Sequence, residues 1–536
     1  MESLLQQLQK MNQFISAPCG GNGKCGKCAV RFKKGATEIT ARDREVFTEE
    51  QLKLGWRLAC LSYPKEGYEI EIPGAEEQIF AQMDRTFSEQ TKDGISSKQL
   101  DDPGAFQRKS DYGIAIDIGT TTLAAVLVDL STGKTVSAAT GINHQRIYGS
   151  DVLSRIRASV DGRRFEMQRC IRQDLRKLIG ELWTENVKKI VIAGNTTMCH
   201  LLRGFPCDRL GVAPFVPVDI GMMKGSAVEL LGLKEFAAEV TILPGISAFI
   251  GADIASGAAL LGMEATESYK LLLDIGTNGE MVLGKKEHLF AASTSAGPAF
   301  EGGNISCGMA SIPGAISHVV IDEKKKAHVD VIGTQNFGTD DASGEKAACG
   351  DRHSISGDGI YGSGMSGYEI SGAGISESGI CGSGMIDLYA EFLRHGIVDE
   401  YGTYIDEYFE NGYFLTDTVK FTQSDIRELQ MAKAAIRAGI EILLQKAGIN
   451  ASQVENCYLA GGFGSQMDVR NAVKIGLIPP ELNDKTVAAG NTALEGAKQY
   501  LLGRLTDPQL KKLIEDTKEV NLANEKEFEE LYLQHM

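Results

Sequence analysis

The feature that most constrains this fold is an internal duplication. The segment YGIAIDIGTTTLAAVLVD carries Asp117 at the end of an apolar run, and YKLLLDIGTNGEMVLGK carries Asp274 in the same place. Each run predicts a buried strand, a glycine turn, a second strand, a turn and a third strand. Helical patterns and further buried strands follow, at 188–202 and 240–261 in the first copy and at 454–465 and 486–502 in the second. The pattern β-β-β-α-β-α-β-α, given twice, predicts two mixed α/β lobes that face each other.

Both copies place an aspartate before a glycine turn that also carries hydroxyl or amide side chains. Such a turn directs several backbone N–H groups into one concavity, which suits phosphate oxygens. The two aspartates are hard oxygen ligands suited to a hydrated Mg²⁺ ion beside the phosphates. Thr120, Thr121 and Thr277 add hydroxyl donors beside the phosphates. The alternative is two structural hairpins with capping aspartates.

Four cysteines near the start of the chain predict a metal centre. Cys19, Cys25 and Cys28 follow the spacing C-x5-C-x2-C, and Cys60 lies far downstream. This is close to the plant-type ferredoxin spacing C-x4-C-x2-C…C, which holds a [2Fe–2S] cluster. The glycines between the first three cysteines give the loop the freedom to fold back, and their N–H groups can point at the sulfurs. A structural zinc site is the alternative, although zinc ribbons usually show two C-x2-C pairs.

Charge and hydropathy exclude several classes of function. The net charge of −16 argues against nucleic acid and membrane surfaces as partners, because phosphate contacts need a basic face. The most apolar later stretch, 240–262, is interrupted by Pro244 and Asp253, so we expect no bilayer span. The first ten residues lack the features of a secretory signal. Eleven cysteines without such a signal predict a reducing, cytoplasmic location.

Composition predicts the domain boundaries. Residues 1–73 form the cluster domain, 74–110 a polar linker, 111–262 the first lobe and 263–536 the second lobe. The Gly/Ser-rich stretch at about 338–379 holds few large apolar residues, so we expect a mobile insertion there, with a functional lid as the alternative.

Together with the segment AGGFG at 460–464, the two turns resemble the nucleotide-binding core of the acetate kinase, sugar kinase, heat-shock ATPase and actin superfamily. The resemblance implies a duplicated, actin-like (ribonuclease H-type) ATPase fold that binds ATP and Mg²⁺ between its lobes. It places Gly461 and Gly462 near the adenosine, where only glycine lets the backbone approach closely. The residues that the resemblance places around phosphate and metal are Asp117, Gly119, Thr120, Thr121, Asp274, Gly276, Thr277 and Asn278. It also suggests Asp253 as a water-orienting or Mg²⁺-shell carboxylate, and Glu301 as a weaker candidate of the same kind.

The whole arrangement resembles the reductive activators of corrinoid proteins. The motifs PCGGNGKCGKC, WRLACL, AIDIGTTT, AGNTTM, APFVPV, LDIGTNGE, SAGPAFEG, ISCGM, GICGSGMID and LAGGFG carry this resemblance along nearly all of the chain. It implies an α/β multidomain protein with a plant-type ferredoxin-like (β-grasp) domain before the ATPase core. The implied function is ATP-dependent reduction of inactive Co(II) to Co(I) in a corrinoid protein of a methyltransferase system. The implied partners are that corrinoid protein and an external low-potential electron donor, and a homodimer is left open.

The start of the chain departs from this pattern. Plant-type cluster domains normally place a β-hairpin before the cysteine loop, whereas the 18 residues before Cys19 predict a helix, so the domain is expected to be truncated or abbreviated. Three other functions stay open at this point. They are an electron activator for another low-potential enzyme such as a dehydratase, a small-molecule kinase with a structural metal domain, and a non-catalytic nucleotide sensor or scaffold.

Overall fold

The computed structural model describes residues 2–10, 15, 21, 23, 26, 28–64, 67–72, 111–311, 314–332, 379–461 and 467–536. Several sequence predictions fall outside these residues: Cys19, Cys25, Gly462, the 74–110 linker and nearly all of the 338–379 insertion. Among the helices that the structure describes, none is long and apolar enough to cross a bilayer.

The N-terminal domain is a small sheet with its own core. Its strands run in the order β2-β1-β3, with β1 antiparallel to both neighbours. Helix α1 packs on η1, and its leucines enter a core with Val30 and Leu58. The helix expected before the cysteine loop is described only over Leu4–Lys10, and β3 is the last strand of the domain. The elements are α1 (Leu4–Lys10), β1 (Ala29–Lys34), α2 (Ala41–Val46), α3 (Glu49–Lys53), β2 (Trp56–Leu58), η1 (Ala59–Leu61) and β3 (Glu69–Glu71).

The first lobe is a six-stranded mixed sheet in the order β6-β5-β4-β7-β9-β8. Strands β4, β5 and β6 form an antiparallel meander, and β7 and β9 continue the sheet in parallel with β4. Helix α6 covers one face and packs against α7 and β6. The elements are β4 (Tyr112–Ile118), β5 (Thr122–Asp129), β6 (Thr135–Ile142), η4 (His144–Ile147), α5 (Val152–Ala158), η5 (Ser159–Arg163), α6 (Arg164–Leu182), β7 (Val187–Gly194), α7 (Thr196–Arg203), η6 (Asp208–Leu210), β8 (Met223–Ser226), α8 (Ala227–Leu231), β9 (Glu239–Ile242) and α9 (Ala252–Leu260).

The second lobe repeats this design in the order β19-β18-β10-β11-β12-β20. The predicted succession of three antiparallel strands, helix, strand, helix, strand, helix is confirmed in both lobes. The elements of this repeat are β10 (Tyr269–Ile275), β11 (Gly279–Lys285), β12 (His288–Thr294), η7 (Pro298–Glu301), α12 (Gln423–Ala447), η8 (Ala451–Gln453), β18 (Val454–Ala460), α14 (Val469–Lys474), η9 (Pro480–Lys485), β19 (Thr486–Gly490) and α15 (Thr492–Leu501), followed by α16 (Asp507–Asp516), β20 (Thr517–Glu519), η10 (Leu522–Asn524) and α17 (Phe528–Gln534).

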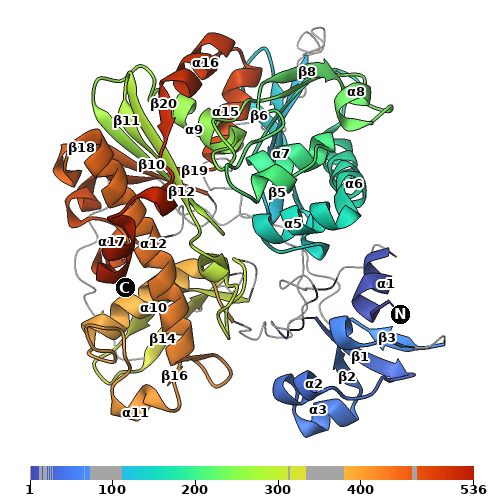
Figure 1. Cartoon of the computed structure of the whole chain (residues 1–536), viewed down its shortest axis with the longest axis vertical. Helices are drawn as coiled ribbons and strands as arrows, with labels where there is room; N and C mark the ends of the chain where they lie inside the picture. Colours follow the sequence, from blue (N-terminus) through green and yellow to red (C-terminus); the bar gives the residue numbers. More distant parts are fainter. Residues whose placement is uncertain are drawn as a thin grey trace, which may run out of the picture.

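A smaller unit is inserted between β12 and α12. Its sheet has the order β14-β13-β15, helix α10 packs on β13, and the hairpin of β16 and β17 follows. Figure 1 shows this unit at the same end of the molecule as the N-terminal domain, with α5 as the first-lobe helix that faces that domain. The elements are β13 (Ala315–Ile321), β14 (Ala327–Val331), β15 (Gly379–Ile380), α10 (Gly382–Arg394), α11 (Asp406–Phe409), β16 (Tyr413–Phe414) and β17 (Lys420–Phe421).

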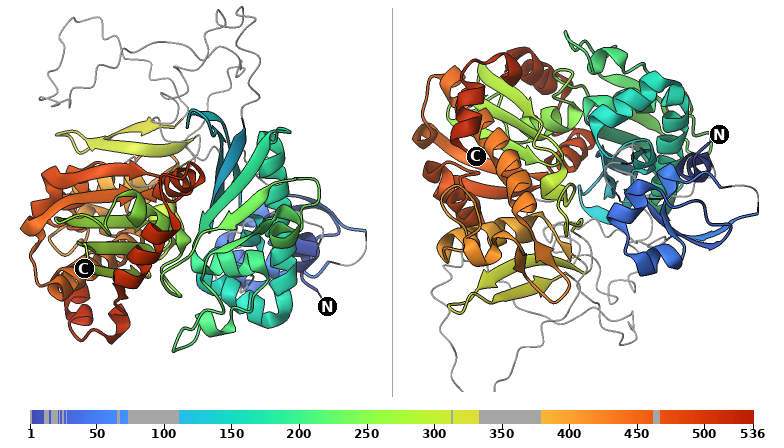
Figure 2. Two further views of the ribbon diagram at one scale, coloured as in Figure 1. Left: turned by 90° about the horizontal axis from the view of Figure 1, so that it is seen from above. Right: turned by 60° about the horizontal axis from the view of Figure 1, so that its bottom comes forward.

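The two lobes meet where α9 and α15 cross, and Figure 2 shows them from two further directions. A Cβ on Gly257 of α9 would lie 2.6 Å from the Thr492 hydroxyl, and one on Gly496 of α15 would lie 2.7 Å from the Ser256 carbonyl oxygen. The helices therefore cross with backbone nearly touching backbone. Around this crossing the lobes share one core, which includes Val191 of β7 and Leu272 of β10.

We expect Gly257→Ala and Gly496→Ala each to lower the free energy of unfolding by about 1–3 kcal/mol, because the added methyl forces two packed helices apart. Thermal unfolding of the purified variants measures this. The matched control is Gly180→Ala on the exposed side of α6, where the nearest outside atom is Phe236 Cζ at 4.0 Å. That control should be neutral or up to about 1 kcal/mol stabilising. Equal melting temperatures for all three variants would contradict the close crossing.

Candidate nucleotide cleft and cluster site

The duplicated turns lie on opposite lobes, and the turn of the second copy is one residue shorter than that of the first. Asp117 precedes a turn in which the Gly119 amide donates to the Thr122 carbonyl at 3.0 Å, and Gly276 donates to the Asn278 carbonyl at 2.9 Å in the second copy. A Cβ on Gly119 would come within 2.7 Å of the Thr122 carbonyl oxygen, so the turn requires glycine. The pairing of β4 with β7 and of β10 with β18 brings each turn to the carboxyl end of parallel strands.

Carboxyl groups from both lobes converge between these turns. Burial raises the pKa of Asp117 to about 6, and a hydrogen bond from Asn491 opposes this shift. Burial, and then repulsion by Asp117 and Glu301, raises the pKa of Asp274 to about 7. Burial, and then repulsion by Asp274 and Asp117, raises the pKa of Asp253 to about 8. These groups keep some contact with solvent. Asp274 and Asp253 are close enough to the other carboxylates for repulsion to disfavour their ionisation. Such crowding suits a site that receives a cation.

Two glutamates extend the acidic cluster. Burial, followed by Asp253 and Asp274, raises the pKa of Glu280 well above its usual range. Burial also raises the pKa of Glu301, against hydrogen bonds from Thr277 and Thr121. Thr277 Oγ1 donates to Glu301 Oε2 at 2.6 Å within the second lobe. Because Thr121 belongs to the first lobe, Glu301 joins the two phosphate turns across the cleft.

Two asparagines hold the first turn from behind. Asn195 accepts the Met198 amide at 2.9 Å as the N-cap of α7, and its Nδ2 donates to Thr120 Oγ1 at 3.0 Å. Asn491 caps α15 through the Leu494 amide at 2.8 Å, and its Nδ2 donates to Asp117 Oδ2 at 2.9 Å. Each asparagine uses its oxygen for a helix and its amide nitrogen for the turn, so the turn residues are oriented by helix ends.

A buried arginine lies beneath the same turn. Arg155 of α5 has no exposed surface, and its Nη2 donates to the Thr120 carbonyl at 2.5 Å. Its Nε donates to the Gly149 carbonyl at 2.9 Å. Burial lowers the pKa of Arg155 to about 10, while Cys170, Asp151 and Glu301 oppose that shift. A guanidinium in this place orients the turn and supplies positive charge near the cleft.

The glycine assigned to the adenosine approaches the acidic cluster. Gly461 has φ +84°, and a Cβ there would lie 2.8 Å from Asp274 Oδ1. The backbone can come this near only as glycine. Gly462 lies outside the described residues, so its contact with adenosine stays a prediction.

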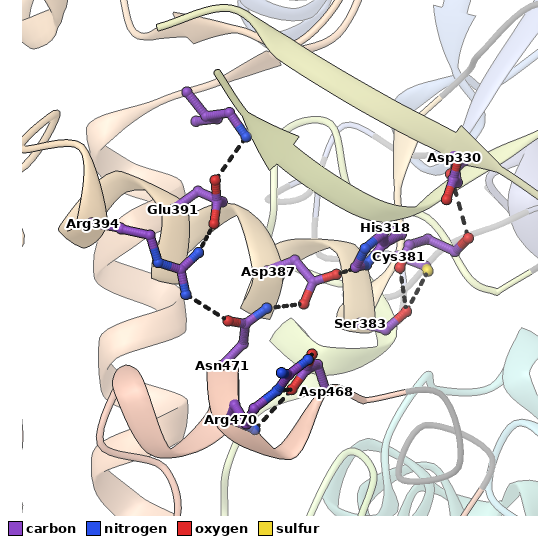
Figure 3. A network of polar contacts seen from close by, with 12 residues as sticks. His318, Asp330, Cys381, Ser383, Asp387, Glu391, Arg394, Asp468, Arg470 and Asn471 are labelled. Carbon is purple, nitrogen blue, oxygen red and sulfur yellow. Dashed lines mark hydrogen bonds and ion pairs between the residues drawn. The ribbon is translucent and has the colours of Figure 1, made fainter. Parts of the chain in front are cut away.

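A polar network anchors α14, the helix that follows this glycine turn (Figure 3). Asp387 of α10 is buried, and it pairs with His318 of β13 and accepts Asn471 Nδ2 of α14 at 2.6 Å. Asn471 Oδ1 in turn accepts from Arg394 at 3.2 Å, and Arg394 pairs with Glu391. The network thus fixes α14 to the inserted unit.

The charge of this network depends on His318. Its hydrogen bond to Asp387 raises the pKa of the imidazole, burial opposes the rise, and the nearby carboxylates of Asp387, Asp330 and Asp468 add to it. A raised histidine pKa means that this pair stabilises the fold below the ordinary histidine pKa and loses that contribution as the pH rises through the raised value.

Two of the four predicted cluster cysteines are described, and they converge. Cys28 and Cys60 are buried with their sulfurs 3.3 Å apart, whereas a disulfide needs about 2.05 Å. Gly21, Gly23 and Gly26 all adopt positive φ, as a loop that folds back around a cluster requires. In the described part of the chain, no group of three or more His, Cys, Asp or Glu side chains is arranged to hold a metal alone. Completing the site therefore depends on Cys19 and Cys25.

Sequence reasoning missed Glu280, Asn195, Asn491 and Arg155. A signal existed for the asparagines, because AGNT occurs at both 193–196 and 489–492, each time between a strand and a helix. Glu280 lies inside the quoted DIGTNGE motif. Arg155 had no local signal, since only the fold brings α5 under the first turn.

Comparison with known protein families now assigns the chain. The profile described as the C-terminal domain of RACo, the ASKHA domain, matches residues 268–536, and the RACo middle region matches 112–266. The 2Fe-2S iron-sulfur cluster binding domain matches residues 1–65. The chain belongs to the RACo family. The predicted resemblance to corrinoid-protein activators and the predicted fold class are confirmed. The match to the iron-sulfur domain favours a [2Fe–2S] cluster over a structural zinc site at the cysteines.

Three similar proteins, two of them named corrinoid enzymes and one a solved structure, align with most of the chain. The corrinoid activation enzyme RamQ of Eubacterium limosum is 30% identical over 469 residues, covering 80% of this chain and 71% of that protein. The [Co(II) methylated amine-specific corrinoid protein] reductase of Methanosarcina barkeri is 27% identical, covering 79% and 76%. The solved structure of a reductive activator for a corrinoid, iron-sulfur protein is 27% identical with a TM-score of 0.65, covering 99% of this chain and 95% of the other.

For the cleft, we expect Asp253→Asn to stabilise the nucleotide-free RACo-type protein at neutral pH. A carboxyl whose pKa is raised to about 8 costs stability as the pH climbs from its ordinary value near 4 toward 8. Melting temperatures of the wild type should therefore fall more steeply between pH 6 and 8 than those of the variant. Asp417→Asn, at an exposed position, is the control and should leave the slope unchanged. Parallel curves for wild type and Asp253→Asn would refute the raised pKa of Asp253.

For the cluster, we expect Cys60→Ser to lose most of the iron and acid-labile sulfide and the visible absorption of the N-terminal domain. One thiolate of four is missing, and an alcohol is a poor ligand for this soft site. Iron and sulfide assays with a visible spectrum measure the effect. Cys457→Ser, in the core of the second lobe, keeps full cluster content. A Cys60→Ser protein that retains two irons and two sulfides would exclude Cys60 as a ligand.

Proposed function

We propose that this chain is an ATP-dependent activator that reduces Co(II) to Co(I) in a corrinoid protein of a methyltransferase system. The observation that carries the proposal is the union, in one chain, of convergent cluster cysteines with a two-lobed cleft whose turns, carboxylates and glycines suit a nucleotide. The names of the relatives point to the same activity. An external low-potential donor that reloads the cluster belongs to the proposal, and a homodimer stays a prediction.

The chain supplies positioning rather than a nucleophile. In this proposal Asp117 and Asp274 hold a hydrated Mg²⁺ ion, and Asp253 orients water. The backbone N–H groups of the two turns bind phosphate oxygens, while Arg155 fixes the first turn. Transfer of a phosphoryl group to water requires positioning and charge stabilisation more than covalent chemistry. The cluster, when bound, supplies one electron.

Nucleotide is needed because the electron moves uphill. Plant-type clusters have potentials near about −400 mV, and each 100 mV uphill costs about 2.3 kcal/mol for one electron. In this proposal, nucleotide binding and hydrolysis change the angle between the lobes around the α9–α15 crossing. That change alters the complex with the corrinoid protein. It works only if ATP binds the two states unequally. Glu301, bonded to both turns, is the group that the arriving phosphates displace or recruit.

The test is anaerobic visible spectroscopy of a purified Co(II) corrinoid protein mixed with the dithionite-reduced chain, with and without Mg-ATP. We expect a Co(I) band only with Mg-ATP. Asp274→Asn should keep its cluster but form Co(I) at least tenfold more slowly, because a metal ligand and cleft charge are lost. Asp417→Asn should behave as the wild type. Equally fast and complete reduction without ATP would refute the coupling, and no Co(I) from a cluster-loaded, ATP-hydrolysing protein would refute the proposed acceptor.

A further inference from the structure

The first lobe exposes large apolar side chains on the segment from α5 to the start of α6. Leu153 is 62% exposed, Val160 59% and Phe165 60%. Leu153 lies on α5, Val160 in the π-helical turn η5 and Phe165 at the start of α6. Single exposed apolar residues are ordinary on a protein surface, but large exposed side chains that follow one another along one stretch of chain are candidates for an interaction site.

This segment is also basic within an acidic chain. Residues 152–165 contain four Arg and one Asp, whereas the whole chain has a net charge of −16. Arg157 is exposed beside Leu153 and Val160, and the Arg164 guanidinium lies 4.4 Å from the centre of the Phe165 ring. Arginine and aromatic side chains are enriched in protein interfaces. We call Leu153, Arg157, Val160, Arg164 and Phe165 the α5 surface.

The inner side of the same helix reaches the nucleotide cleft. Arg155 lies between Leu153 and Arg157 in sequence, yet it points inward and binds the Thr120 carbonyl of the first phosphate turn. Immediately after α5, the π-helical turn η5 contains Gly162 at φ +91°, which breaks the helix before α6. A protein bound to the α5 surface therefore contacts α5, a short helix separated from α6 by Gly162. Through Arg155, α5 is also hydrogen-bonded to the first phosphate turn.

The place of α5 in the molecule also matters. Figures 1 and 2 show the N-terminal domain beside the first lobe, and Figure 1 shows α5 at the end of the lobe that faces it. A protein bound to α5 would lie near the domain that holds the cluster, as an electron acceptor must.

We propose that the α5 surface is the docking site for an acidic face of the corrinoid protein, and that docking there is coupled to nucleotide binding through Arg155. This inference rests on the proposed function and adds the surface and the chemistry of the partner. The chain's own cluster domain is the poorer occupant, because residues 1–72 hold eleven basic and nine acidic side chains and do not complement a basic surface. A basic patch on an acidic protein orients an acidic partner during encounter.

The experiment compares three full-length, cluster-loaded variants for binding to a purified Co(II) corrinoid protein. Leu153→Asp/Val160→Asp should weaken binding at least tenfold, which is about 1.4 kcal/mol. Arg157→Glu should slow association and reduce its dependence on salt. Val136→Asp is the matched control, since Val136 is 51% exposed on β6, and it should bind as the wild type. All three should keep the wild-type cluster spectrum and basal ATP hydrolysis.

Coupling has its own readout. The corrinoid protein should change the ATP affinity of the wild type, and this change should vanish in the double variant, because coupling between two ligands is reciprocal. Should the double variant fail to fold, Arg157→Glu alone carries the test. Wild-type affinity in both variants would overturn the inference while leaving the proposed function intact, provided the wild type still forms Co(I) with ATP. If the variants bind the corrinoid protein normally but transfer electrons more slowly, the α5 surface contacts the cluster domain instead. If the wild type is a dimer and the variants are not, the α5 surface serves self-association. Either result overturns the inference.

Discussion

The crossing of α9 and α15 at two glycines is the constraint on which the cleft depends. With no side chain between them at Gly257 and Gly496, the helices pass at backbone distance and their N-terminal ends point into one space. One end brings Asp253 and the other brings Asn491, which holds Asp117. A wider crossing would move these groups apart, and the two phosphate turns would no longer share a carboxylate cluster.

The carboxyl groups gathered in the cleft lower the stability of the nucleotide-free protein. Carboxyl groups with raised pKa values sit together because the site is built for a cation and a nucleotide rather than for maximal stability. The caps Asn195 and Asn491 orient the site, because each asparagine serves a helix and a turn at once. The network of His318, Asp387 and Asn471 plays a similar part for α14.

Much of this architecture could be predicted from the sequence because it repeats. Strand periodicity followed by an aspartate and a glycine turn, found twice, predicted the order of elements in both lobes and the aspartates that meet in the cleft. The cysteine spacing predicted the iron-sulfur domain because it is a local pattern of metal ligands. The remaining site groups were hidden for physical reasons. Asn195 and Asn491 look like ordinary helix caps until their second hydrogen bond is seen, and the depth of Arg155 follows from tertiary packing alone.

The shared core between the lobes has a consequence for how the chain is made. Strand β4 lies near the start of the first lobe, yet a Cβ on Gly113 of that strand would lie 2.7 Å from Leu501, at the end of α15. The face of the first sheet that α15 and α9 cover joins Val191 and Ala193 to Ala497 of α15. During synthesis, the part of that face that α15 covers stays uncovered until the chain has been made as far as α15. The first lobe therefore cannot complete its core before α15 of the second lobe has been made. Until then, this apolar face of the nascent chain is exposed to aggregation or chaperone binding.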